Sequence, residues 1–199
     1  MVYLLGYTGA GKSTLLNYLI GGDMDYEKKN GKFLFKNRQD PESKFFPSIG
    51  NGLDSETMLP RSFTLSSENI SFVDTPGFMS TSGPIQEISD SYANSKIFKK
   101  GNKVKIVLVL EENTLFSGRG EFLIKAAKKI SEMFPDFEDA MGIISCSSIV
   151  VTKVDSWQIT LSDIYSTLEE ILESRKSNNR DIYFMLRNIL DHKNVYILP

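Results

Sequence analysis

The chain has 199 residues, of which 41% are hydrophobic and 24% are charged, and its formal net charge is −2. This composition fits one globular domain with a substantial core, and the slightly acidic balance gives no sign of a surface built for nucleic acid, so we expect no nucleic-acid partner. Cys146 is the single cysteine and His192 the single histidine, which excludes an internal disulfide, a His/Cys metal site and a catalytic triad. The lack of any possible internal disulfide agrees with a reducing compartment, and no apolar run has membrane-spanning length, so we expect a cytoplasmic protein.

The first twenty residues predict a strand, a glycine-rich loop and a helix. Val2–Leu5 is an apolar run that fits a buried strand, and Thr14–Ile20 carries apolar residues at helical spacing. Between them, Gly6–Ser13 fits G-x-x-x-x-G-K-[ST], the phosphate-binding P-loop. Glycines let backbone N–H groups approach phosphates, and the helix directs its positive end at them. Lys12 then supplies a charge to the outer phosphates and Ser13 a hydroxyl to Mg²⁺. The expected phosphate-binding residues are Thr8, Gly9, Ala10, Gly11, Lys12, Ser13 and Thr14.

The next segment predicts a turn, a short strand and a long loop. Asp23–Lys32 is polar and contains the turn signal Asn30-Gly31, after which Phe33 and Phe35 alternate with polar residues as in a short edge strand. Residues 37–60 are rich in Asn, Asp, Ser, Gly and Pro, which favours a loop. Strands are expected at 61–65 and 69–73, and their short connection predicts an antiparallel pair.

The rest of the chain alternates helices with strands. We expect helices opened by Pro84, over residues 122–134, over 162–175 and over 182–190, with strands at 104–110, 148–151 and 195–198. This alternation predicts an α/β fold with a mainly parallel six-stranded sheet, one antiparallel strand and helices on both faces. Ligands bind at the carboxyl ends of the strands in such a sheet.

Two further motifs lie at predicted strand ends. Asp74–Gly77 fits D-x-x-G, in which the Asp74 carboxylate holds Mg²⁺ and the Gly77 N–H meets a γ-phosphate. Alone, this tetrapeptide is explained by turn chemistry, but here it follows a strand and a P-loop. Thr152–Asp155 fits [NT]-K-x-D, in which Asp155 accepts two hydrogen bonds that guanine offers and adenine does not.

The [NT]-K-x-D motif also has a departure and a rival interpretation. The aliphatic stem of Lys153 can lie over the base, while Thr152 stands where asparagine is commoner and leaves a smaller side chain to brace the P-loop. The alternative to a guanine-binding protein is a P-loop ATPase or kinase. Asp155 argues against it, because adenine does not offer the two hydrogen bonds that this carboxylate would accept.

Taken in order, the three motifs resemble the translation-factor-related class of P-loop GTPases. The phrase from Gly6 to Asn17 is most similar to the septin-like branch, which includes immunity-associated and chloroplast import-receptor GTPases, and divergent protist G-domain proteins look similar. The resemblance implies a Ras-like fold, GTP and GDP as ligands, Mg²⁺ as cofactor and a nucleotide-dependent switch. It also implies a switch-loop residue that binds Mg²⁺, for which Ser55 and Thr57 are candidates and Thr57 is preferred.

The same resemblance implies a reaction, GTP hydrolysis to GDP and phosphate. Its catalytic group would consist of Lys12, Thr57 and Gly77. Ras-like GTPases orient the attacking water with a glutamine just after D-x-x-G. Phe78 stands there and cannot hydrogen-bond a water, which predicts slow hydrolysis unless a partner supplies the missing group, for instance Arg119 of a second copy in a homodimer. The alternative is an assembly or scaffold module that binds nucleotide without hydrolysing it.

The resemblance also bears on the extent of the domain. The last guanine-contacting loop and the terminal helix of such proteins follow the strand expected at 195–198. We therefore expect residues 1–199 to form a single G domain that lacks these two elements.

Overall fold

The computed structural model describes eleven parts of the chain, from the first residue to residue 198. These are residues 1–29, 32–37, 47, 60–65, 68–76, 104–118, 120–133, 142–143, 146–154, 159–175 and 180–198. The predicted helix at Pro84 and nearly all of the predicted loop at 37–60 lie outside them.

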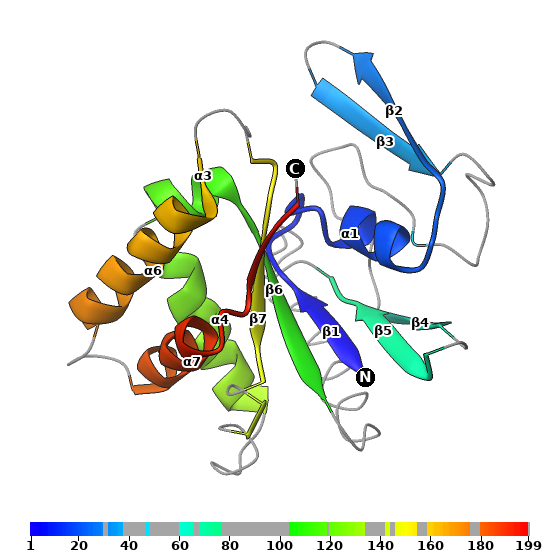
Figure 1. The fold of residues 1–199 in the computed structure, drawn as a ribbon. Coiled ribbons are helices and arrows are strands. Elements are labelled where there is room, and N and C mark those ends of the chain that lie inside the picture. Colours follow the sequence, from blue (N-terminus) through cyan, green and yellow to red (C-terminus); the bar gives the residue numbers. More distant parts are fainter. Residues whose placement is uncertain are drawn as a thin grey trace, which may run out of the picture.

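A six-stranded sheet with the order β4-β5-β1-β6-β7-β8 forms the centre of the molecule (Figure 1). Within this sheet, only β4 and β5 pair in antiparallel fashion, and each of the other neighbours is parallel. The predicted fold class is thereby confirmed. The strands are β1 (Val2–Leu5), β4 (Arg61–Leu65), β5 (Ile70–Asp74), β6 (Lys105–Glu111), β7 (Ser148–Thr152) and β8 (Val195–Leu198).

Helices cover both faces of this sheet (Figure 1). One face carries α1 (Lys12–Leu19), and the other carries α3 (Glu112–Ser117), α4 (Glu121–Met133), α6 (Leu161–Arg175) and α7 (Arg180–Asp191). The short helix α3 was not among the predicted elements. None of the helices in the described parts is long and apolar enough to cross a membrane.

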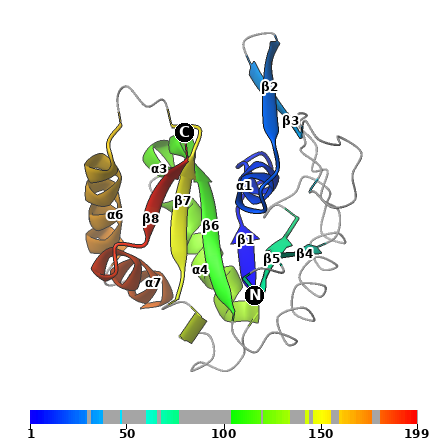
Figure 2. The same ribbon diagram turned by 45° about the vertical axis from the view of Figure 1, so that its right-hand side comes forward.

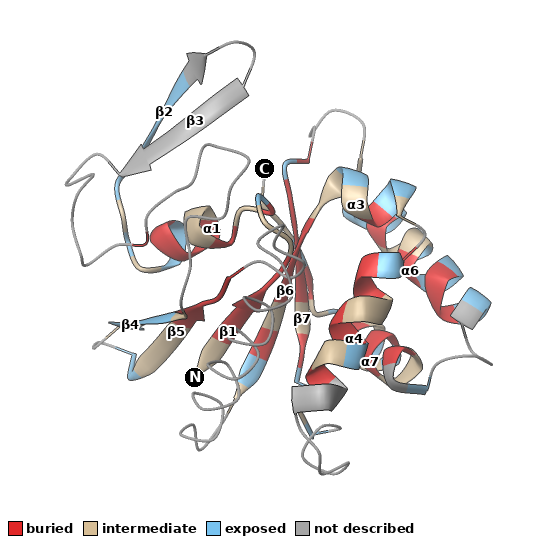
Figure 3. Ribbon diagram, turned by 180° about the vertical axis from the view of Figure 1, so that it is seen from behind, coloured by how far each residue is buried: buried red, intermediate tan, exposed pale blue. Residues whose placement is uncertain are grey.

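Side-chain alternation along β1 explains why both faces are covered. Tyr3 and Leu5 belong to the larger core beneath α4, α6 and α7, whereas Leu4 belongs to a smaller core with Leu15 and Leu16 of α1. Successive residues of a strand point to opposite faces, so an unbroken apolar strand needs helices on each side. The burial pattern follows this arrangement, with buried residues along β1, β5, β6 and β7 and on the inner sides of the helices (Figure 3).

A two-stranded hairpin stands apart from the main sheet in both views (Figures 1 and 2). It consists of β2 (Met24–Lys29) and β3 (Lys32–Asn37), which pair antiparallel with Lys29 opposite Lys32. The expected short strand at Phe33 and Phe35 lies within β3. The preceding polar segment also forms a strand, which its sequence did not predict.

Strand register brings four strand ends to one edge of the main sheet. Leu4 lies opposite Asp74, Leu5 opposite Leu108, and Glu111 opposite Thr152. Because these strands are parallel, the segments that leave their carboxyl ends emerge side by side. The P-loop and the beginnings of both other motifs lie at this edge.

Candidate functional site

The P-loop connects β1 to α1, and its backbone geometry requires glycine at three positions. Gly9 and Gly11 have φ angles of 84° and 86°, which residues with a side chain rarely adopt. A Cβ atom on Gly6 would collide with the carbonyl oxygen of Val109 in the neighbouring strand. The hydroxyl of Thr8 is buried and has no hydrogen-bond partner within the described residues. The loop therefore combines a tight turn with a polar group suited to a ligand.

Lys12 is buried in this loop, with 7% of its surface exposed. Its Nζ atom donates hydrogen bonds to the carbonyl oxygens of Gly6 at 3.2 Å and Tyr7 at 2.9 Å. Burial lowers the pKa of Lys12 to about 8, and the nearby charge of Asp74 opposes this shift. A phosphate would be a stronger partner for this desolvated ammonium group than two neutral carbonyls.

Ser13 and Asp74 meet next to Lys12, although 61 positions separate them in the sequence. The Ser13 hydroxyl donates to Oδ2 of Asp74 at 2.8 Å, and Asp74 is buried. Thr75 fixes the adjacent backbone, since its hydroxyl donates to the Leu4 carbonyl oxygen at 2.6 Å. Hydroxyl and carboxylate oxygens are ligands that Mg²⁺ prefers, so these two side chains fit that ion. Among the described residues, no three His, Cys, Asp or Glu side chains cluster as an all-protein metal site.

Thr152 lies behind the P-loop at the end of β7. Its buried hydroxyl is 2.8 Å from the Ala10 carbonyl oxygen and 3.1 Å from the Leu110 carbonyl oxygen. The side chain that replaces the commoner asparagine thus still contacts the P-loop. Thr152 links β6, β7 and the P-loop through one hydroxyl group.

Lys153 and Glu111 form an ion pair at the same edge, with 2.7 Å between Nζ and Oε1. Glu111 was not among the predicted site residues. Its only sequence signal is a carboxylate that directly follows the apolar strand predicted at 104–110.

Asn17 is a second contact that sequence analysis missed. This side chain is fully buried in α1, and its Nδ2 atom donates to the carbonyl oxygens of Ser13 and Pro47, each at 2.8 Å. It joins the beginning of the helix to the loop predicted at 37–60. A lone amide in an otherwise apolar helical segment was the available signal.

The side of the P-loop next to α4 is fixed by aromatic packing. Tyr7 packs against Phe122 with their ring centroids 4.7 Å apart.

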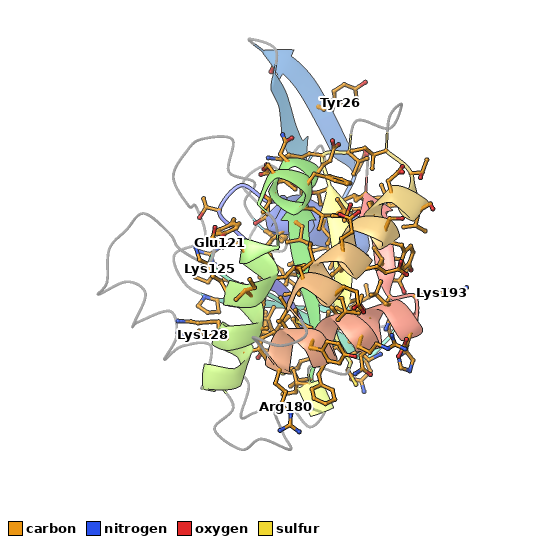
Figure 4. The ribbon with its side chains drawn as sticks, turned by 90° about the vertical axis from the view of Figure 1, so that its left-hand side faces the viewer. Tyr26, Glu121, Lys125, Lys128, Arg180 and Lys193 are labelled. Carbon is orange, nitrogen blue, oxygen red and sulfur yellow. The ribbon has the colours of Figure 1, made fainter. Side chains whose placement is uncertain are left out.

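Glu121, Lys125 and Lys128 follow one side of α4 (Figure 4), where Glu121 and Lys125 form an ion pair of 2.6 Å. This pair raises the pKa of Lys125 and lowers that of Glu121. It is exposed, so its contribution to stability is small.

The structure thus brings together the P-loop residues 8–14, Asp74, Thr152 and Lys153. The other predicted site residues lie outside the described parts. These are Thr57 and its alternative Ser55, Gly77, Phe78, Arg119 and Asp155.

Comparisons with solved structures give distant likenesses. The chain aligns over 99% of its length with 68% of a dimerization-deficient mutant of Toc33 from Arabidopsis thaliana, at 16% identity and a TM-score of 0.49. An S. thermophilus NFeoB mutant bound to mGDP aligns over 94% of this chain and 76% of its own, at 11% identity and a TM-score of 0.36. At such identities and scores, neither likeness bears on ligands or partners.

A comparison with curated proteins found no significant match. The family comparison is decisive, because the model described as 50S ribosome-binding GTPase matches residues 1–136 of this chain. That range includes the P-loop, Asp74–Gly77 and strands β1 to β6. The chain therefore belongs to this family of P-loop GTPases and is a GTP-binding G-domain protein with a Ras-like fold.

Proposed function

We propose that the protein is a Mg²⁺-dependent GTPase that hydrolyses GTP slowly and acts as a nucleotide-dependent switch. The observation that carries this proposal is the 2.8 Å contact between Ser13 and Asp74 beside the buried Lys12. A cation, a hydroxyl and a carboxylate converge there at a helix N-terminus, which is the donor set that a nucleotide phosphate with its metal requires.

Each residue has a role in this proposal. Backbone N–H groups of residues 9–14 hold the phosphates, and Lys12 supplies charge to the outer ones. Ser13, Asp74 and Thr57 would hold Mg²⁺, and the bound ion would supply positive charge at the phosphoryl group. The backbone of Gly77 positions the γ-phosphate. Catalysis in this class is mainly positioning and charge stabilisation.

Guanine recognition is assigned to Asp155, with the stem of Lys153 lying over the base. We expect Asp155→Asn to weaken GTP binding and favour a xanthine nucleotide, whose base edge has the complementary hydrogen-bonding pattern. Loss of a charge-assisted hydrogen bond should weaken GTP binding by about 1.5–3 kcal/mol. Calorimetric titration of both proteins with GTP, XTP and ATP measures the effect.

The controls separate base recognition from phosphate recognition. Lys12→Ala should abolish tight binding of every nucleotide, because the charge at the phosphates is lost. Equal affinity of the wild type and Asp155→Asn for GTP would contradict the guanine assignment. Tight binding of ATP by the wild type would favour the rival ATPase or kinase.

Membership of the septin-like branch and the cellular compartment of the protein are also proposals. The phrase from Gly6 to Asn17 supports the septin-like branch, and the lone Cys146 suits a reducing, cytoplasmic setting. Residues 1–199 would then be a single G domain, with a homodimer or another protein partner contacting the switch loops.

A further inference from the structure

Glu111 and Lys153 meet at the sheet edge that carries the P-loop. Glu111 is the last residue of β6 and lies opposite Thr152 of β7, so that Lys153 follows directly. The Nζ atom of Lys153 lies 2.7 Å from Oε1 of Glu111. The lysine side chain is 56% exposed and the glutamate side chain 29% exposed, so the pair is open to solvent on one side.

The backbone of Lys153 is held in an unusual conformation. Its φ angle is 55°, in the left-handed region that a lysine rarely adopts. Such a conformation persists where the surroundings fix it, and it concentrates at ligand sites. Here the preceding residue, Thr152, is anchored to Ala10 and Leu110, and the lysine tip is held by Glu111.

The carboxylate of Glu111 also lies beside the P-loop. A Cβ atom on Gly9 would be 3.7 Å from Oε1 of Glu111. Glu111 is the N-cap residue of α3, yet its side chain makes no capping hydrogen bond and binds Lys153 instead. An unpaired carboxylate at this place would repel nucleotide phosphates, and the lysine neutralises it.

We propose that Glu111 is a positioning residue of the guanine-nucleotide site, acting through Lys153. Its carboxylate fixes the ammonium group next to the P-loop, and this orders the aliphatic stem on which the base lies. The lysine in turn cancels a negative charge close to the phosphates. The inference rests on the proposed function, because it assumes that a guanine nucleotide occupies this edge.

The experiment measures GDP dissociation, by displacement of a fluorescent GDP, in a double-mutant cycle. Glu111→Gln should release GDP about threefold to fivefold faster than the wild type, as expected for one solvent-facing ion pair. Lys153→Met keeps an unbranched apolar stem but leaves Glu111 unpaired, so its release should be faster still. The double variant should release GDP no faster than Lys153→Met, because the repelling carboxylate is gone. Glu112→Gln, which removes one carboxylate at the next position, is the matched control and should behave as the wild type.

The outcomes separate this inference from the proposed function. Failure of the wild type to bind GDP would remove the proposed function itself. Tight GDP binding by the wild type with unchanged release in Glu111→Gln would overturn the role of Glu111. The role of Glu111 would also be overturned if the increases in the GDP release rate of the two single variants simply multiplied in the double variant. Thermal unfolding of each variant shows whether a faster release reflects loss of fold, which a local positioning role does not require.

Discussion

At Thr152, one hydroxyl group connects two strands with the P-loop. A hydroxyl has one proton, and here it lies between the carbonyl oxygens of Ala10 and Leu110. The Ala10 carbonyl belongs to the loop that would hold the phosphates. Loop geometry at the candidate site therefore depends on a residue 142 positions further along the chain.

We expect Thr152→Val to destabilise the protein by about 1–3 kcal/mol, because it leaves two buried carbonyl groups without this donor. Valine has nearly the same shape, so the loss of packing is small. Thr152→Ser keeps the hydroxyl and is the matched control. Urea unfolding of the two variants measures the difference, and equal stability of Val and Ser variants would contradict the bracing role.

Lys12 gives the ligand-free protein a pH-dependent stability. Its folded-state pKa is lowered to about 8 from the ordinary value of 10.5, chiefly by burial. Between these values the unfolded chain holds the proton and the folded chain does not, so the unfolding free energy rises with pH. Relative to Lys12→Met, the wild type should gain on the order of 3 kcal/mol across this window. Urea unfolding of both proteins from pH 7 to pH 10.5 tests this, and a constant difference would contradict it.

The residues of the candidate site divide according to what a sequence can reveal. Lys12, Ser13, Asp74 and Thr152 belong to short motifs whose spacing reflects chemistry, and the structure brings them together. Glu111 and Asn17 act through contacts with residues 42 and 30 positions away, respectively. A contact of this kind depends on strand register and helix packing, and local spacing does not encode either.

At the scale of elements, Gly120 lies directly before α4 and packs closely against α6. It precedes α4 with a φ angle of 75°, and a Cβ atom there would lie 2.6 Å from Cγ2 of Ile171 in α6. The residue before α4 must therefore adopt a left-handed backbone conformation and have no side chain. The close approach of this residue to Ile171 is possible only because glycine has no side chain.

We expect Gly120→Ala to destabilise the protein by about 2–4 kcal/mol, since it adds overpacking to an unfavourable backbone conformation. Gly21→Ala is the matched control. Gly21 has a φ angle of 82°, but a Cβ atom there would meet nothing within 4 Å. Its cost should be about 1–2 kcal/mol from the backbone alone. Equal unfolding free energies for the two variants would show that the Ile171 side chain moves aside without a cost in stability.

The hairpin shows where elements escape prediction. In β3, Phe33 and Phe35 alternate with other residues and indicate a strand, whereas β2 reads Met-Asp-Tyr-Glu-Lys-Lys. Asp, Glu and Lys are depleted in strands, so local propensity argued against β2. Pairing with β3 outweighs that propensity in the folded chain. The central strands β1, β6 and β7 were predictable because they are apolar runs that are largely buried on both faces.

At the scale of the whole molecule, the missing water-orienting glutamine has a kinetic consequence. We expect slow GTP turnover per molecule, because Phe78 follows the D-x-x-G motif and cannot hydrogen-bond the attacking water. If a second copy supplies Arg119, turnover should rise with protein concentration, by up to roughly 10³–10⁵-fold. The assay measures phosphate release at saturating GTP over a range of protein concentrations.

Arg119→Ala distinguishes the possible origins of any rise. Loss of the concentration dependence in this variant would support an arginine donated between copies, and its persistence would point to another group. A rate that is fast and independent of concentration would contradict slow intrinsic hydrolysis. No measurable hydrolysis together with tight GTP binding would favour the assembly module.

The register of β1 has a consequence for how the protein acquires its ligand. Val2 pairs with both Phe72 and Lys105, and β6 in turn pairs with β7, so the central parallel pairs join segments far apart in the chain. Closing such large loops is slow, so we expect the central strands to pair late in folding and cooperatively. A peptide of residues 1–20 would contain the whole P-loop consensus but neither Asp74 nor Thr152. We therefore expect affinity for nucleotide to appear only when the central strands have paired. Binding of a nucleotide during refolding would then measure when the fold is complete.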